Sequence, residues 1–270
     1  MITKIAFGGG GMKGILHIGA LQELETIQSL DFPDGIYGCS IGSIVAVLVA
    51  FRIPMSNVIP HMSLSFETFL AKPTFEDVMN AYQTKGVYSM ESFATAVCSF
   101  FDACGIDIRD KVIGDAPQPL FIVASNLTKG VPTLFTKDVP ILTALQCSCC
   151  IPGLFRPQIV YDQVYVDGGV FVPCLSWLQP DAFVLTLAKQ TTHVTPSKLI
   201  TLSPFGFAHS LYTSAYNLFV EQRKTENVLC LSYPNLHSDT DLTTMDLQPM
   251  LEHARSELRR FLRSKSLLQE

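Results

Sequence analysis

The chain has 270 residues, 48% of them hydrophobic and only 16% charged, so it can bury a sizeable core and is not disordered. Its formal net charge of −5 argues against a nucleic-acid binder, and we expect no nucleic-acid partner. No apolar run reaches the ~20 residues of a membrane span and no signal peptide is visible, so we expect a cytoplasmic protein with peripheral membrane contact at most.

The predicted elements alternate between strands and helices. Strands are predicted at residues 2–7, 36–39, 119–127, 133–136, 164–169, 181–188 and 227–233, and helices at 15–27, 41–51, 206–214 and from 247 onward. This alternation predicts an α/β fold, a mostly parallel central sheet flanked by helices. No composition shift marks a boundary, so we expect one domain over 1–270, with a helical, cap-like segment at 54–105.

Four consecutive glycines, Gly8 to Gly11, separate the first predicted strand from the first helix. A plain flexible turn rarely needs four of them. A P-loop requires Gly, then Lys, then Ser or Thr, whereas here Lys13 comes before Gly14 and isoleucine follows. The P-loop interpretation therefore fails on spacing.

A dinucleotide-binding loop is the next alternative, because Gly9, Gly11 and Gly14 match G-x-G-x-x-G literally. That motif also needs an acidic residue at the end of the second strand. The nearby Asp31 and Asp34 come before that strand, and its end carries the pentapeptide GCSIG instead.

GCSIG fits G-x-S-x-G, the sharp strand-to-helix turn that exposes a nucleophilic serine. Gly38 and Gly42 avoid steric clashes in that turn, and Ser40 would stand at the positive end of the helix at 41–51. An ordinary helix N-cap is the structural alternative for Ser40. Ser43 is a rival nucleophile, but it lacks the flanking glycines and lies inside the predicted helix.

The glycine run suits a serine nucleophile. Acyl transfer builds negative charge on a carbonyl oxygen, and backbone N–H groups aimed at that oxygen stabilise it. We interpret Gly9, Gly10 and Gly11 as this oxyanion hole, because glycines let the backbone approach closely. Lys13 is expected to face solvent or to anchor the loop.

The general base is less obvious from the residues alone. The chain has six histidines, His17, His61, His193, His209, His237 and His253. In the order found in α/β-hydrolases only His209 or His237 would serve, and neither has a recognisable catalytic setting. Asp167 ends a predicted strand and is followed by Gly168 and Gly169; a common Asp-Gly turn explains this pattern equally well.

The combination of motifs resembles the patatin-like phospholipases. Besides the glycine loop, G-x-S-x-G and D-G-G, the segments TKGVYSMESF, FIVASNLTKGVPTLFT and ALQCSCCIPGLFRPQIVYDQVYVDGGV resemble family segments in the same order. The resemblance covers about residues 2–172. It implies a three-layer fold and lipid acyl hydrolysis, usually of phospholipids, without a metal or cofactor.

It further implies a Ser–Asp dyad without histidine, in which Ser40 is the nucleophile and Asp167 the base. An acyltransferase that uses the same acyl-enzyme is an alternative, and an inactive lipid-binding module is another. The main departure from the family is the run Cys147, Cys149 and Cys150, where Ser or Ala is common. Its spacing is a poor match to zinc ligands, and we expect buried, reduced thiols.

Two segments could meet lipid. For the cap-like segment we expect a small core of its own for most apolar residues, some of which could line an acyl groove or a mobile lid: Met55, Met62, Phe66, Phe69, Leu70, Phe75 and Met79. The amphipathic C-terminal helix within 247–270 could rest on anionic lipid, but packing on the sheet with a solvated basic face is favoured.

Overall fold

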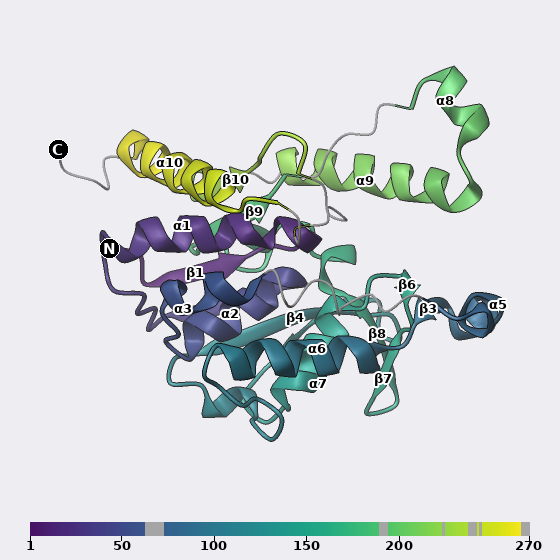
Figure 1. Ribbon diagram of the computed structural model, residues 1–270, viewed down its shortest axis with the longest axis horizontal. Helices are drawn as coiled ribbons and strands as arrows, with labels where there is room; N and C mark the ends of the chain where they lie inside the picture. Colours follow the sequence, from purple (N-terminus) through teal and green to yellow (C-terminus); the bar gives the residue numbers. More distant parts are fainter. Residues whose placement is uncertain (63–72, 189–193, 223–224, 237–241, 243–244, 266–270) are drawn as a thin grey trace.

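The computed structural model describes residues 1–62, 73–188, 194–222, 225–236, 242 and 245–265 (Figure 1). The strands of its main sheet are β1 (Lys4–Phe7), β2 (Gly35–Cys39), β4 (Leu120–Asn126), β5 (Val131–Phe135), β7 (Gln158–Val160), β8 (Gln163–Asp167), β9 (Phe183–Leu187) and β10 (Val228–Leu231). The helices are α1 (Ile15–Glu25), α2 (Ile41–Ala50), α3 (Met55–Val58), α5 (Phe75–Thr84), α6 (Met90–Ala103), α7 (Ile141–Cys149), α8 (Pro196–Thr201), α9 (Pro204–Gln222) and α10 (Gln248–Ser264).

The main sheet has the order β10-β9-β1-β2-β4-β8-β7, and β5 pairs with β4 outside this path. The first five of these strands are parallel, whereas β5 and β8 run antiparallel to β4. The predicted α/β class with a mostly parallel sheet is therefore confirmed. The predicted strands and helices correspond to observed elements with ends that differ by a few residues, except that the helix predicted at 206–214 extends over Pro204–Gln222.

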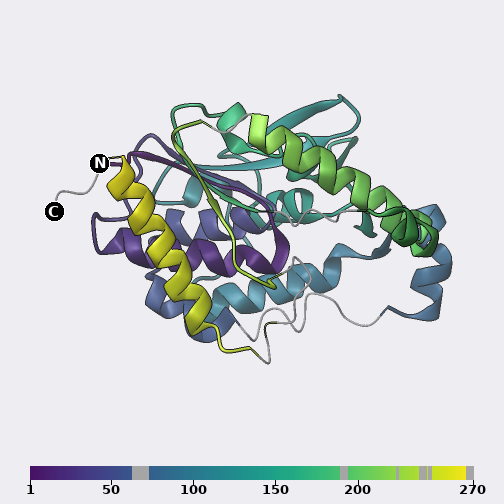
Figure 2. The ribbon, with the colours of Figure 1, turned by 90° about the horizontal axis from the view of Figure 1, so that it is seen from above.

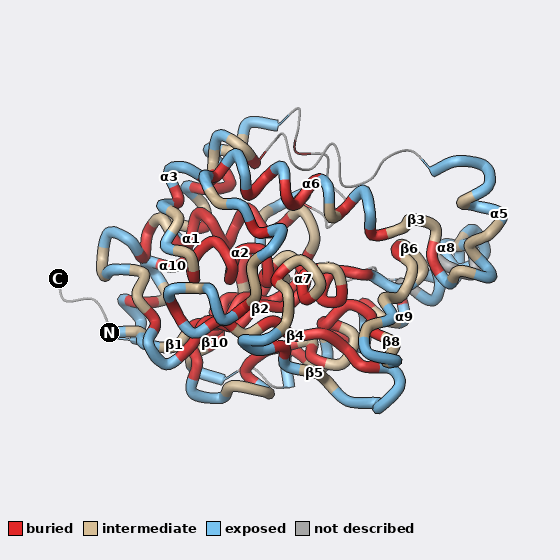
Figure 3. The backbone as a smooth tube through the Cα atoms, turned by 90° about the horizontal axis from the view of Figure 1, so that it is seen from below, coloured by how far each residue is buried: buried red, intermediate tan, exposed pale blue. Residues whose placement is uncertain are grey.

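Side chains of the parallel strands alternate between two separate apolar layers, as the period of a β-strand requires. Ile5, Phe7 and Leu185 face the large core formed with α1, α2, α6, α7 and α10. Ala6 and Val184 face a smaller core that includes residues of α9. Figure 2 shows α9 on one side of the sheet and α1, α2 and α10 on the other, which is the expected three-layer arrangement. Figure 3 shows that burial is concentrated around the sheet.

The carboxyl ends of the parallel strands share one edge of the sheet. The glycine loop follows β1 there and Ser40 follows β2, after which α1 and α2 run back along the sheet. In Figure 1 this edge points toward the end of the molecule that carries α5 and α8, and the N-terminus and the C-terminal end of α10 lie at the opposite end. Open α/β sheets bind their ligands outside the carboxyl ends of the strands.

The cap-like segment at 54–105 is not helical throughout. Residues Gly86–Tyr88 form strand β3, which pairs in parallel with β6 (Gly153–Phe155) in a small second sheet. Met55 and Met62 join the main core, whereas Phe75 and Met79 are exposed, so the expected separate core is wrong for these four residues. Phe66, Phe69 and Leu70 lie outside the described residues.

The C-terminal helix α10 packs chiefly against α1 rather than directly on the sheet, so the sequence expectation is right that this helix packs on the protein and wrong about the element it meets. Its apolar face is buried, and a Cβ at Gly19 of α1 would lie 2.7 Å from the carbonyl oxygen of Leu251, so only glycine permits this approach. The buried Glu23 accepts two hydrogen bonds from the guanidinium of Arg259, at 2.7 and 2.8 Å. Within the described ranges, none of the helices combines the length and apolar character needed to cross a bilayer.

Candidate active site

The G-x-S-x-G segment forms the sharp turn that its pattern predicts. Ser40 has φ 54° and ψ −132°, a backbone conformation that costs free energy in a residue with a side chain. A Cβ at Gly42 would lie 2.1 Å from the carbonyl oxygen of Phe7, and one at Gly38 would lie 2.4 Å from the Cα of Ser43. Both glycines are therefore required for the turn to pack between β1 and α2.

Three hydrogen bonds hold the backbone of this turn. The amide N–H of Ser40 donates to Oγ of Ser148 at 2.9 Å, and that hydroxyl donates to the carbonyl oxygen of Val123 at 2.6 Å. Ser43 donates its hydroxyl to the carbonyl oxygen of Ser40 at 2.6 Å and is fully buried. The rival serine is thus part of the support of the turn, which favours Ser40 as the reactive hydroxyl.

The glycine loop lies directly against the Ser40 side chain. A Cβ at Gly9 would be 2.9 Å from the Cβ of Ser40 and 3.6 Å from its Oγ. A Cβ at Gly10 would instead meet the side chain of Leu187 at 2.7 Å, so this residue is fixed by the neighbouring strand. Gly11 has φ 58° and begins the short 3₁₀ helix Gly11–Gly14 that leads into α1.

Lys13 does not face solvent, so that part of the sequence expectation is wrong. Its side chain is buried, and its Nζ donates to the carbonyl oxygen of Ala188 at 2.5 Å, just after β9. The alternative, that Lys13 anchors the loop, agrees with this contact. Gly14 completes the packing, because a Cβ there would lie 2.4 Å from the side chain of Ile41 at the start of α2.

His17 lies behind the glycine loop and is fully buried. Its Nε2–H donates to the carbonyl oxygen of Gly8 at 2.9 Å, and its ring packs edge-on against Phe7. Burial lowers the pKa of His17 to about 4, because the charged imidazolium would lose its hydration. His17 therefore stays neutral near pH 7 and orients the first peptide of the loop.

Asp167 ends β8 next to the serine turn. It pairs in register with Ala124 of β4, whose neighbour Val123 pairs on the other side with Cys39, the residue before Ser40. A Cβ at Gly168 would lie 2.9 Å from the Sγ of Cys39. Ser40 and Asp167 thus flank the same part of β4 although they are far apart in the sequence.

Several hydrogen bonds fix the D-G-G turn. Oδ1 of Asp167 accepts the amide N–H of Gly169 at 2.8 Å, and its own amide donates to the carbonyl oxygen of Cys150 at 2.9 Å. Ser125 donates its hydroxyl to the carbonyl oxygen of Asp167, and Tyr212 of α9 donates to that of Gly169 at 3.1 Å. Burial, and next the negative charge of Asp167, raise the pKa of the Tyr212 hydroxyl, which stays protonated.

The cysteine run lies behind the two turns. None of the eight cysteines forms a disulfide bond, and Cys147, Cys149 and Cys150 are buried. Burial raises the pKa of Cys147 to about 12 and that of Cys149 and Cys150 further, so these thiols are poor nucleophiles near pH 7. Among the residues described, no cluster of three or more His, Cys, Asp or Glu side chains could hold a metal ion.

The histidine alternatives are only partly visible. His193 and His237 lie outside the described residues, and nothing is described of the side chain of His209. The sequence did not indicate three residues that hold the two turns by hydrogen bonds, Ser125, Ser148 and Tyr212. It also did not indicate that His17 binds the glycine loop. Ser148 sits inside the run CSCC, where the cysteines drew attention to metals; the others carry no local signal.

Three comparisons with known proteins bear on the family and the fold of this chain. A family model described as patatin-like phospholipase matches residues 5–176, which is more than half of the chain. An uncharacterized NTE family protein of Mycobacterium bovis is 28% identical over 173 residues, 63% of this chain and 43% of that protein. The uncharacterized protein YqhO of Bacillus subtilis is 27% identical over 194 residues, 64% of this chain and 65% of that protein.

Two solved structures share the fold. VipD from Legionella pneumophila matches with a TM-score of 0.56 at 15% identity, and the matched region covers 96% of this chain and 66% of the VipD chain. The type III effector protein ExoU matches with a TM-score of 0.50, also at 15% identity, and the matched region covers 100% of this chain and 54% of the ExoU chain. The chain thus spans less than half of its mycobacterial relative. With a family model that matches 5–176 in a fold of this kind, the chain belongs to the patatin-like phospholipase family.

Proposed function

We propose that this protein is a serine lipid acyl hydrolase that cleaves carboxylic ester bonds of phospholipids or related lipids. The observation that carries the proposal is the strained Ser40 turn, with Gly9 against its side chain and Asp167 on the other side of β4. Residues 1–270 act as one domain in this proposal, because α10 closes the fold against α1.

The proposed reaction passes through an acyl-enzyme. Ser40 Oγ attacks the ester carbonyl carbon while the Asp167 carboxylate takes the hydroxyl proton. Backbone N–H groups of Gly9, Gly10 and Gly11 stabilise the negative charge on the carbonyl oxygen, each donor being worth roughly 3–4 kcal/mol. The leaving alcohol receives the proton, and water, activated by the same carboxylate, releases the fatty acid and restores the serine.

Asp167 is the proposed base rather than a histidine. An aspartate is a weaker base than a histidine by about 2.6 pK units in their unperturbed states, so the dyad depends on a strong oxyanion hole. Of the described histidines, His17 is buried and its Nε2–H is bound to the glycine loop, which supports a structural role for it. The D-G-G backbone is held by Ser125 of β4, by Tyr212 of α9 and by the Asp167 carboxylate itself, and this support suits a carboxylate that must keep one position.

A fluorophosphonate probe and a phospholipid panel test the proposal. Ser40→Ala should lose probe labelling and turnover by about a thousandfold or more, while Ser43→Ala, which loses only a hydrogen bond that supports the turn, should still be labelled. Asp167→Asn should be nearly inactive, because an amide cannot accept the serine proton.

Alanine variants of the three candidate histidines complete the test: His193, His209 and His237. Each should keep most of its activity. A folded histidine variant that loses about a thousandfold would replace the dyad with a triad. Acyl transfer to an added alcohol that exceeds hydrolysis would favour the acyltransferase alternative.

A further inference from the structure

Helix α5 presents its apolar face to solvent. Phe75, Val78, Met79 and Tyr82 recur at the spacing of one helix face and are between 54% and 85% exposed. We call these four side chains the α5 stripe. No residue of α5 is buried. A surface helix normally turns such a face toward the core.

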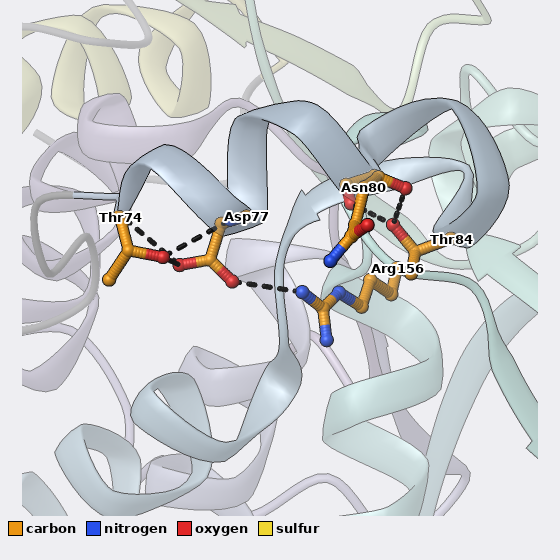
Figure 4. Close-up of polar contacts among 6 residues, drawn as sticks. Thr74, Asp77, Asn80, Thr84 and Arg156 are labelled. Carbon is orange, nitrogen blue, oxygen red and sulfur yellow. Dashed lines mark hydrogen bonds and ion pairs between the residues drawn. The ribbon is translucent and has the colours of Figure 1, made fainter.

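The polar face of α5 is the one that contacts the protein (Figure 4). Asp77 pairs with Arg156, which follows β6, at 2.9 Å, and also completes a capping box with Thr74. Thr84 donates its hydroxyl to the carbonyl oxygens of Asn80 and Gly86. The polar residues of α5 and Arg156 line a pocket of about 360 Å³. The orientation of α5 is therefore fixed by polar contacts, and the α5 stripe is left as an outer surface.

A second apolar surface lies at the same end of the molecule. Helix α8 carries the exposed Leu199 and Ile200 next to the exposed Lys198. Figure 1 shows α5 and α8 at one end of the long axis, the end toward which the carboxyl ends of the parallel strands point. A flat surface across this end would meet both helices on the side of Ser40.

The charges at this end of the molecule indicate which kind of partner surface it would bind. The whole chain carries −5, yet no Asp or Glu occurs from residue 182 to residue 220, which includes α8 and most of α9. On α5, the charge of Asp77 is compensated by Arg156, and Glu76 is the other acidic residue of the helix. Lys85 lies over the ring of Tyr82 at 4.5 Å, beside the α5 stripe. Apolar side chains flanked by an aromatic ring and lysines suit an anionic lipid surface.

We propose that the α5 stripe, together with Leu199 and Ile200 of α8, docks this protein onto the surface of an anionic lipid bilayer. The inference rests on the proposed function, because it supplies the approach by which Ser40 meets its lipid. The docked end faces the membrane, and the N-terminus and the C-terminal end of α10 face away from it.

Vesicle co-sedimentation of the Ser40→Ala protein tests docking without turnover. This protein should bind vesicles of phosphatidylcholine with phosphatidylserine. Adding Met79→Gln and Tyr82→Gln, which keep α5 helical, should lower the partition coefficient by about tenfold or more. Ile200→Gln should lower it severalfold. Lys198→Gln should lower it by about fivefold on anionic vesicles and leave binding to phosphatidylcholine alone unchanged.

Leu218→Gln is the matched control, since Leu218 is also exposed but lies near the far end of α9. It should leave binding unchanged; an effect as large as that of the Met79 and Tyr82 pair would move the docking face and overturn the proposal. Vesicle binding that ignores the α5 and α8 variants would also overturn it. So would a dimer in size-exclusion chromatography that the α5 variant converts to monomer, because a second copy would then cover the α5 stripe.

Hydrolysis of a short-chain, water-soluble ester separates this inference from the proposed function. With an intact Ser40, the α5 variant should hydrolyse that ester as fast as the wild type. Loss of this activity in the folded variant would mean that the α5 stripe belongs to the catalytic fold, and docking would be wrong. If the wild type hydrolyses no ester but the pattern of vesicle binding holds, docking stands and the proposed hydrolysis falls.

Discussion

Replacing His17 should remove a specific part of the acid sensitivity of this fold. His17 is fully buried with a pKa of about 4, whereas an unfolded chain would hold it near 6.5. The unfolded state therefore binds more protons between these two values, and the free energy of unfolding falls as the pH drops through this window. Relative to pH 7, the titration of His17 should lower the free energy of unfolding by about 2 kcal/mol at pH 5 and by about 3 kcal/mol at pH 4.

Two variants separate the titration from the hydrogen bond. His17→Gln keeps an N–H that can donate to the carbonyl oxygen of Gly8 but does not titrate. His17→Phe removes both, and leaves that carbonyl without its donor at a cost of about 1–3 kcal/mol at pH 7. Both variants should lack the extra loss between pH 7 and pH 5. His17→Phe should also lower kcat for a water-soluble ester, because the peptide before Gly9 loses its support.

Urea unfolding followed by circular dichroism at pH 7 and pH 5 gives the required free energies. The wild type should lose about 2 kcal/mol more than His17→Gln over this interval. Equal losses in the two proteins would show that His17 is not held neutral in the folded state. A His17→Phe protein with wild-type kcat and normal stability would show that this side chain does not orient the glycine loop.

The remaining predictions concern the loop, the serine turn and the C-terminal helix. Gly9→Ala should lower kcat for a soluble ester by about tenfold or more, because its Cβ would lie 2.9 Å from that of the candidate nucleophile; unchanged kcat would refute this. Ser148→Ala should cost about 1–3 kcal/mol in urea unfolding, since it removes two buried hydrogen bonds. Arg259→Met should lower the free energy of unfolding, because it leaves the buried Glu23 with weaker compensation, whereas the exposed Arg263→Met should leave it almost unchanged in the same urea titration.

The fold was predictable where its signals are local. β1, β2, β4 and β9 are short apolar runs bounded by turns, and the helices after β1 and β2 follow glycine motifs that start them. β3 and β6 were not predicted, because each has only three residues and they pair with each other across a long stretch of sequence. The closest contact there, a Cβ at Gly86 against the backbone of Phe155 at 2.2 Å, leaves no periodic pattern.

In the candidate site, too, the features with a local sequence signal were predictable and those that depend on distant contacts were not. The turn around Ser40 was predictable from G-x-S-x-G, because its glycines are required by contacts that the pattern encodes. The pairing of Asp167 with this turn needed the family resemblance, since only the sheet order brings them together. The burial of Lys13 was missed because a lone lysine usually faces solvent, whereas here the carbonyl oxygen of Ala188 is within reach. The catalytic roles stay predictions.

The two amphipathic helices show why periodicity alone does not identify a lipid-binding surface. α10 and α5 both carry an apolar stripe, and the sequence offered α10, with its arginines, as the one that could meet lipid. In the fold, the stripe of α10 is packed on α1, and Glu23 engages Arg259, so lipid contact there would expose a core and separate a buried carboxylate from its partner. The stripe of α5 faces out because Asp77 and Arg156 hold the opposite face. The contacts made by the other faces of each helix therefore decide whether its apolar stripe is exposed. Of these two helices, α5 has the exposed stripe, and it lies at the end of the molecule toward which the Ser40 turn points.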